Sequence, residues 1–74
     1  MREGLLWFDD DPRRHIDEKV RLAAARYRQK FGVAPDVCYV NRRMIDRAEL
    51  RIGDVRVVPV STVLPNHFWV GRAG

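Results

Sequence analysis

The chain combines short apolar runs with one long segment in which apolar residues recur at helical spacing. Through residues 12–31 the apolar side chains are three or four positions apart, which is typical of a helix with one face on a core. They are Ile16, Val20, Ala23, Ala24, Tyr27 and Phe31. Asp11 suits an N-cap, Pro12 suits the first helical position, and Gly32 suits a helix end. We therefore predict a helix from Pro12 to Phe31.

Short runs rich in valine, isoleucine and aromatic residues predict the strands of a small sheet. Two of these runs are separated only by Gly53-Asp54, a spacing typical of a tight β-hairpin. Pro59 ends the second hairpin strand or marks it as an edge. The predicted strands are residues 5–8, 37–40, 50–52, 55–57 and 67–70, with a helical turn around residues 43–48.

A strand, a long helix and a second strand in this order form a parallel crossover in most proteins. Asp9–Asp11 and Asn41–Arg43 then lie at the same edge of the sheet. We predict a single α/β domain over residues 1–74: a small mixed sheet, built as β-α-β followed by a β-hairpin and a last short strand, with the helix packed on one face.

One helix covers only one face of such a sheet, yet the strands carry large apolar side chains on both faces. Leu5 and Trp7 alternate with Leu6 and Phe8, and alternate residues of a strand point to opposite faces. Exposed apolar surface on a small domain marks an interaction site. We expect either a homodimer that packs sheet to sheet or a partner-binding groove, and favour the homodimer because it enlarges a small core.

Composition narrows the class of protein. The 74 residues are 46% apolar and 32% charged, which is typical of a folded globular domain. The single cysteine, Cys38, excludes an internal disulfide and a Cys-x-x-Cys zinc or redox motif. We interpret it as a core residue rather than a nucleophile served by His67. No apolar run is long enough for a membrane span or a signal peptide, so we expect a cytoplasmic protein without a cofactor.

The formal net charge is +4, and the basic excess lies in residues 38–74, with six bases against three acids. Guanidinium groups bind phosphates in a bidentate manner and stay charged at any working pH. The candidate binding residues are therefore Arg42, Arg43, Arg47, Arg51 and Arg56, which together with Arg72 could form a patch that attracts phosphates. The alternative is an ordinary charged surface, because a charge of this size is common in small domains.

His67 and Trp69 complete the candidate binding set. Aromatic residues on strands beside arginines resemble sheet platforms that stack unpaired bases. His67 could also shuttle protons or bond to the backbone of the preceding turn. Aromatic residues on short strands are more often core residues, and the chain lacks the known nucleic-acid-binding motifs.

Asp9, Asp10 and Asp11 are the only acidic cluster at a strand end. Carboxylates in this position resemble the Mg²⁺ pockets of receiver and haloacid-dehalogenase domains, which need further strands that this chain is too short to supply. The alternative is that Asp10 and Asp11 cap the helix, whose N-terminal field repels a cation. We favour the cap over the metal site.

The stretches Leu6-Trp7-Phe8-Asp9 and Leu64-Pro65-Asn66-His67-Phe68-Trp69-Val70-Gly71 resemble short uncharacterised bacterial proteins that end in Leu-Pro-Asn-His-Phe-Trp-x-Gly. The resemblance spans most of the chain and implies no activity. From the residues, we expect an interaction module, homodimeric, that binds an acidic partner such as nucleic acid through its arginine-rich surface. The alternative is a minimal metal-dependent hydrolase or nuclease that uses Asp9–Asp11. We favour binding over catalysis.

Overall fold

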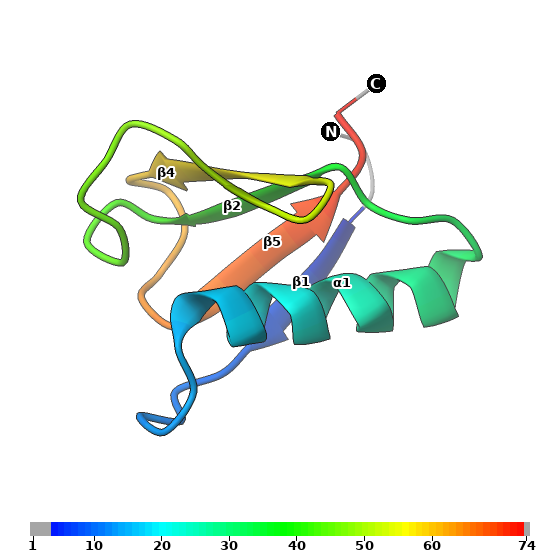
Figure 1. Ribbon diagram of the computed structural model, residues 1–74, viewed down its shortest axis with the longest axis horizontal. Coiled ribbons are helices and arrows are strands. Elements are labelled where there is room, and N and C mark those ends of the chain that lie inside the picture. The colour runs from blue at the N-terminus through cyan, green and yellow to red at the C-terminus, as the bar shows by residue number, and fades with distance from the viewer. Residues whose placement is uncertain (1–3, 74) are drawn as a thin grey trace.

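The computed structural model describes residues 4–73, which form one helix and five strands (Figure 1). The elements are β1 (Gly4–Phe8), α1 (Ile16–Phe31), β2 (Val37–Asn41), β3 (Leu50–Ile52), β4 (Val55–Val60) and β5 (His67–Gly71). The helix packs on a mixed sheet, which confirms the predicted small α/β fold. Every predicted strand is present, and β4 continues beyond its predicted end to Val60. Within the described residues, no helix is long and apolar enough to span a membrane.

The strand order in the sheet is β1-β5-β2-β4-β3. β5 is antiparallel to both β1 and β2, β4 is parallel to β2, and β3 is antiparallel to β4. Because β1 and β2 both run against β5, they are parallel to each other, as a β-α-β crossover requires. The strand that comes last in the chain lies between them. Asp9 and Asn41 therefore lie at the same end of the sheet, as predicted.

The core lies between α1 and one face of the sheet (Figure 1). From the helix, Val20, Ala23 and Tyr27 are buried, and Lys19 has a buried side chain as well. The buried apolar residues of the sheet on this side are Cys38, Val40, Ile52, Val55, Val57, Phe68 and Val70, while Val37 is buried on the opposite face, which it shares with Tyr39. The helix ends at Gly32, which has a left-handed φ of 77° and donates its N–H to the carbonyl of Arg28. The predicted apolar stripe and helix end are both confirmed.

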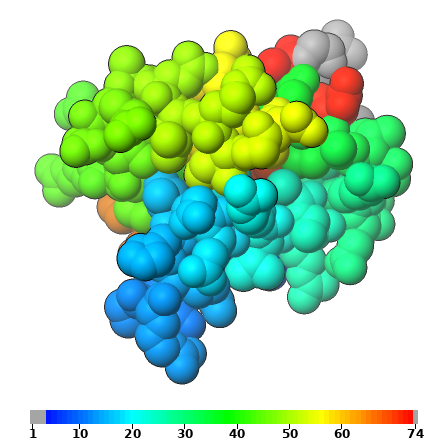
Figure 2. Space-filling model, in the orientation of Figure 1, coloured from blue at the N-terminus to red at the C-terminus, as the bar shows by residue number. Residues whose placement is uncertain are grey.

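The prediction that the helix begins at Pro12 with Asp11 as its N-cap is wrong. α1 begins at Ile16, and its N-cap is His15, whose side chain makes no capping hydrogen bond. The Asp11 carboxylate accepts the backbone N–H of Arg13 at 2.9 Å, a local bond that favours a turn over a helix. The segment between β1 and α1 consequently forms a turn that projects from one corner of the molecule (Figures 1 and 2).

The β3–β4 hairpin has the predicted two-residue connection. Ile52 pairs with Val55, and Gly53 has a φ of 58°. A positive φ at the first central residue alone is the pattern of a type II′ turn. The turn before β5 contains Asn66, also at a positive φ of 65°, which asparagine tolerates better than most residues.

Pro59 lies inside β4, although its missing N–H disfavours the middle of a sheet. The carbonyl of Val60 accepts the N–H of Arg42 on the β2 side, so the backbone nitrogen of Pro59 faces the side of β3. There β3 reaches only as far as Val57 along β4. Pro59 therefore sits where β4 is locally an edge, in agreement with the prediction.

The predicted helical turn at residues 43–48 is wrong, because this segment forms turns and bends. Asn41 organises it: its carbonyl accepts the N–H of Met44, and its Oδ1 accepts the N–H of Arg43, both at 2.9 Å. Met44 and Ile45 then pack against the core. Packing of these two side chains holds the segment in place without the backbone hydrogen bonds of a helix.

Candidate functional site

No helix of the described chain covers the sheet face opposite α1, and the loop before β5 lies against part of it. Its side chains form rows because the strand register aligns them. Leu6 of β1 pairs with Trp69 of β5, Trp69 pairs with Tyr39 of β2, and Tyr39 pairs with Val58 of β4. This row crosses four strands. We call this surface the open face; it comprises Leu6, Phe8, Tyr39, Val58, Val60, His67 and Trp69.

The open face is mainly apolar; it is exposed at β1, and its residues on β2, β4 and β5 are half-buried. Leu6 is 57% exposed and Phe8 is 54% exposed, whereas Trp7, between them on the other face, packs against the core. The prediction that one helix covers only one face of the sheet is confirmed for the described residues, and the other face is most exposed at β1. Sequence reasoning did not separate Phe8 from Trp7 or Trp69 from Phe68, because both residues of each pair are large and adjacent.

Phe8 and His67 form the next row of the open face, with ring centroids 4.9 Å apart and planes inclined by 54°. The Nδ1 atom of His67 lies 2.9 Å from the carbonyl oxygen of Pro65. Since a carbonyl only accepts, Nδ1 is the donor of this hydrogen bond. The bond to the turn backbone agrees with the structural role considered for His67 and fixes its ring on the open face.

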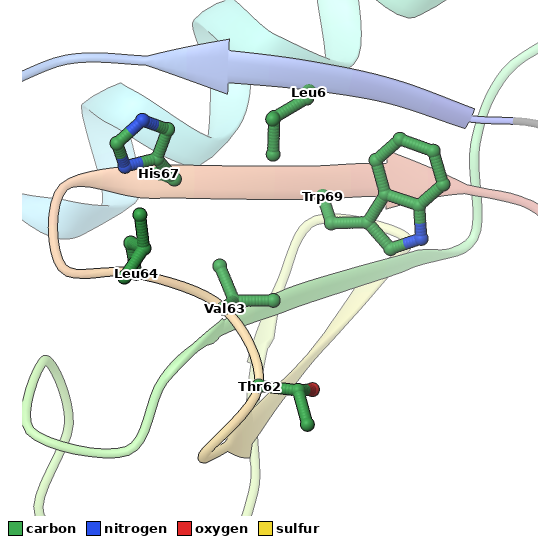
Figure 3. A pocket seen from close by; sticks show the side chains of 6 residues that line it. All are labelled: Leu6, Thr62, Val63, Leu64, His67 and Trp69. Carbon is green, nitrogen blue, oxygen red and sulfur yellow. The ribbon is translucent and has the colours of Figure 1, made fainter.

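A hollow of about 430 Å³ lies between β5 and the loop that precedes it (Figure 3). Leu6, His67 and Trp69 line it from the strands, and Thr62, Val63 and Leu64 line it from the loop. The loop is held by Asn41, whose Nδ2 donates to the carbonyl of Val63 at 2.8 Å. A volume in this range accommodates a small ligand or a nucleobase. The loop residues could not be identified from the sequence, since only the fold brings them beside Trp69.

The structure does not bring the six predicted arginines together. Arg51 and Arg56 pair with each other across β3 and β4 and share the face parity of Val58. Arg56 also binds Glu49 through Nε at 3.1 Å. Arg56 is opposite Val37, and Arg42 follows Val37 by five residues, so about 16 Å of strand separates the two arginines.

The remaining arginines lie elsewhere. Arg43 and Arg47 line a second hollow beside Ile16 at the start of α1. The Nη1 atom of Arg72 donates to the carbonyl of Ala34 at 2.8 Å, so this guanidinium is held against the loop before β2. Of the predicted arginines, only Arg51 and Arg56 therefore border the open face.

The three aspartates at the end of β1 have different surroundings. Asp9 is buried, and its carboxylate accepts Arg14 Nε at 3.0 Å and the N–H of Asp11 at 3.0 Å. Asp11 binds the Arg13 guanidinium through both oxygens, and Asp10 is exposed. The prediction that Asp10 and Asp11 cap the helix is wrong, because α1 begins later and the carboxylates bind in the preceding turn.

The negative charges of Asp9 and Asp11 are balanced by arginine side chains rather than by a cation site. The hydrogen bond from Arg14 lowers the pKa of Asp9, and the hydrogen bond from Arg13 lowers the pKa of Asp11. Both carboxylates are therefore ionised and already neutralised. Over residues 4–73, no group of three or more histidine, cysteine and acidic side chains is arranged to hold a metal ion.

Cys38 is fully buried on the helix side of the sheet. His67 is on the open face, so the two side chains are on opposite sides and cannot act as a nucleophile and its base. Burial raises the pKa of the Cys38 thiol to about 12. This confirms the interpretation of Cys38 as a core residue.

We expect the Cys38 thiol to be inert in the folded protein. Compared with an ordinary thiol pKa of about 8.5, a pKa near 12 lowers the thiolate fraction roughly a thousandfold. An aromatic disulfide reagent at pH 8 should therefore react with Cys38 at least about 100-fold more slowly in the native protein than in urea. Equal rates in the two conditions would contradict the burial of Cys38.

Comparison of the chain with protein-family models, with curated proteins and with solved structures gives no match.

Proposed function

We propose that this protein is a binding module for single-stranded nucleic acid and that the open face is its binding surface. One observation supports this most: four rings, those of Phe8, Tyr39, His67 and Trp69, are on the same sheet face, with Phe8 exposed and the other three half-buried. Trp7 and Phe68 point to the core instead. Unpaired bases stack on exposed aromatic side chains, and each stacked base contributes about 1–3 kcal/mol.

The hollow beside Trp69 suits one base of such a strand. Its walls are mainly aliphatic, and the rings of His67 and Trp69 border it. An aliphatic wall contacts a base ring without selecting its identity, so we expect a preference for single strands over duplexes rather than for one sequence.

The charges on the open face favour an anion but are few. Arg51 and Arg56 border it, and the whole chain has a net charge of +4. For single strands, the slope of log K against log salt is about −0.7 per neutralised phosphate. Two arginines therefore predict a slope of about −1.4, whereas all six predicted arginines acting together would give about −4.

The test is fluorescence anisotropy of a labelled single-stranded oligonucleotide and of its duplex, titrated with protein from ~20 to ~300 mM salt. We expect the single strand to bind more tightly, with the shallow slope. Trp69→Ala should weaken binding about 5- to 100-fold because one stacking partner is lost. Leu22→Ala, which removes an apolar side chain that is 41% exposed on α1, is the matched control and should have no effect.

Two results would overturn this proposal. One is the absence of binding at the lowest salt, which would leave a protein as the partner of the open face. The other is equal binding of the duplex with a slope near −4, which would indicate general attraction to all the arginines. The metal-dependent hydrolase has no support from the geometry, since Asp9 and Asp11 are bound by arginines.

A further inference from the structure

The two edges of the sheet differ in how they are protected. β3 has three residues, Leu50–Ile52, with Arg51 in the middle and Glu49 beside it, and a short, charged edge discourages pairing with another strand. β1 is longer, and its sequence Gly-Leu-Leu-Trp-Phe contains neither a charge nor a proline. Among residues 4–73, β5 is the only strand that pairs with β1. The outer edge of β1 therefore lacks the usual protection.

The backbone groups that face this edge can be identified from the ladder. The N–H of Asp9 donates to the carbonyl of Asn66, its direct partner in register. In an antiparallel pair, directly hydrogen-bonded residues alternate with residues whose backbone groups point outward. Leu5 and Trp7 thus bond to β5, while Gly4, Leu6 and Phe8 direct their N–H and C=O groups to the outer edge.

We propose that the outer edge of β1 pairs antiparallel with β1 of a second copy of this chain, with Leu6 opposite Leu6 on the two-fold axis. In this register Gly4 faces Phe8 of the second copy, and every outward residue meets an outward residue. Each such pair exchanges two backbone hydrogen bonds. A register shifted by one residue would place each residue whose backbone groups point outward opposite a residue whose groups point to β5, so the hydrogen bonds could not form.

The side chains of β1 fit this self-pairing. On the open face Leu6 meets Leu6, and the large Phe8 lies opposite Gly4. On the helix side Leu5 lies opposite Trp7 of the second copy. A hollow of about 310 Å³ beside Leu5 and Trp7, bordered by α1, provides room for these side chains. No like charges face each other along the strand.

A second copy is favoured over an unrelated strand because pairing about Leu6 places the large Phe8 opposite Gly4 at both ends of the paired segment, with uncharged apolar residues opposite each other between them. A two-fold axis through Leu6 is perpendicular to the sheet, so the open faces of both copies lie on the same side. The two sheets would form one continuous surface twice as wide. Self-pairing does not depend on the nucleic-acid proposal, and its test contains no nucleic acid.

We expect a weak dimer with a dissociation constant of ~10–100 μM, since one strand pair buries less than about 1,200 Å². Sedimentation equilibrium from ~5 to ~500 μM protein should show a monomer–dimer equilibrium. A salt concentration of ~0.3 M screens the charges of Arg26 and Lys30 beside the edge. In parallel, amide hydrogen exchange at Leu6 and Phe8 should slow as the protein concentration rises, because these N–H groups become paired.

Two variants separate edge pairing from sheet-to-sheet packing. Chemical synthesis with an N-methylated Leu6 amide removes one outward donor and keeps every side chain, so the dissociation constant should rise at least about tenfold. Val58→Lys places a charge on the open face at β4, three strands away from the β1 edge, and should leave the dimer intact. Circular dichroism verifies that both variants are folded.

The proposal is overturned if the wild-type protein remains monomeric at ~500 μM, or if Leu6 and Phe8 exchange at concentration-independent rates. It is also overturned if Val58→Lys abolishes the dimer, which would instead indicate sheet-to-sheet packing. The exchange measurement uses the unmodified chain, so it tests the edge pairing even if the N-methylated protein does not fold.

Discussion

Phe68→Ala should destabilise the domain by about 3–5 kcal/mol, the usual cost of replacing a buried phenylalanine by alanine. Phe68 is the largest fully buried side chain of the described residues, and it lies on the strand between β1 and β2. A domain of this size has a total stability of about 4–11 kcal/mol. The substitution therefore removes a large part of the free energy of unfolding and lowers Tm by at least about 12 °C.

Urea unfolding followed by circular dichroism measures this effect at low protein concentration. The matched control is Phe8→Ala, because Phe8 is the same residue type but lies half-exposed on the opposite face of the sheet. It should cost less than about 1 kcal/mol. If the two substitutions cost the same, the assignment of the faces is wrong, and with it the open face.

Asp9→Asn should destabilise the domain by about 1–2 kcal/mol. The Asp9 side chain is 3% exposed and accepts a charged hydrogen bond from Arg14, which amide substitution weakens. Because Arg14 is partly exposed to solvent, we expect the loss of stability to lie near the lower end of this range. Asp10→Asn is the matched control: Asp10 is exposed and in the same turn, and its substitution should leave the unfolding free energy unchanged.

The same interaction makes stability depend on pH in a known direction. Arg14 lowers the pKa of Asp9 below its value in the unfolded chain, so the unfolded state takes up the proton first as the pH falls. The stabilisation is complete above the unfolded pKa, near 3.9, and is lost as the pH falls through the lower, folded pKa. Urea unfolding from pH 7 to pH 2.5 should show this decline, with a smaller one in Asp9→Asn.

A decline of equal size in wild-type protein and in Asp9→Asn would contradict the role of Asp9. The decline would then come from other carboxylates. Asp11 contributes in the same direction, because Arg13 lowers its pKa too, and for this reason the comparison between variants is more informative than the wild-type curve alone.

Local signals in the sequence were sufficient for the parts of the fold that depend on neighbouring residues. The stripe on α1 and its end at Gly32 follow from spacing and from the left-handed conformation that glycine adopts easily. The start of α1 was predicted too early, because the capping signals of Asp11 and Pro12 compete with side-chain bonds in the turn. One of those bonds, from Arg14 to Asp9, depends on burial of Asp9 at the end of a strand.

The parts that failed or stayed undecided depend on residues far apart in the chain. Of two adjacent aromatic residues such as Phe68 and Trp69, either one could point to the core. Only pairing with β1 and β2 determines which one is buried. The arginines that were predicted to form a patch because they are near in sequence lie apart in the structure. Arg42 and Arg56 lie toward opposite ends of parallel strands. An open apolar face, in contrast, was predictable, since one helix cannot cover two faces.

The position of β5 governs when the domain can form during synthesis. β1 is joined to the sheet only through β5 among the described strands, by pairs such as Gly4 with Gly71. A nascent chain on the ribosome can form α1 and the β3–β4 hairpin early, but β1 has no strand to join until residues 67–71 have emerged. A chain broken off before β5 leaves Leu6, Trp7 and Phe8 without a strand to pair with, so the strand made last is the one that completes the sheet.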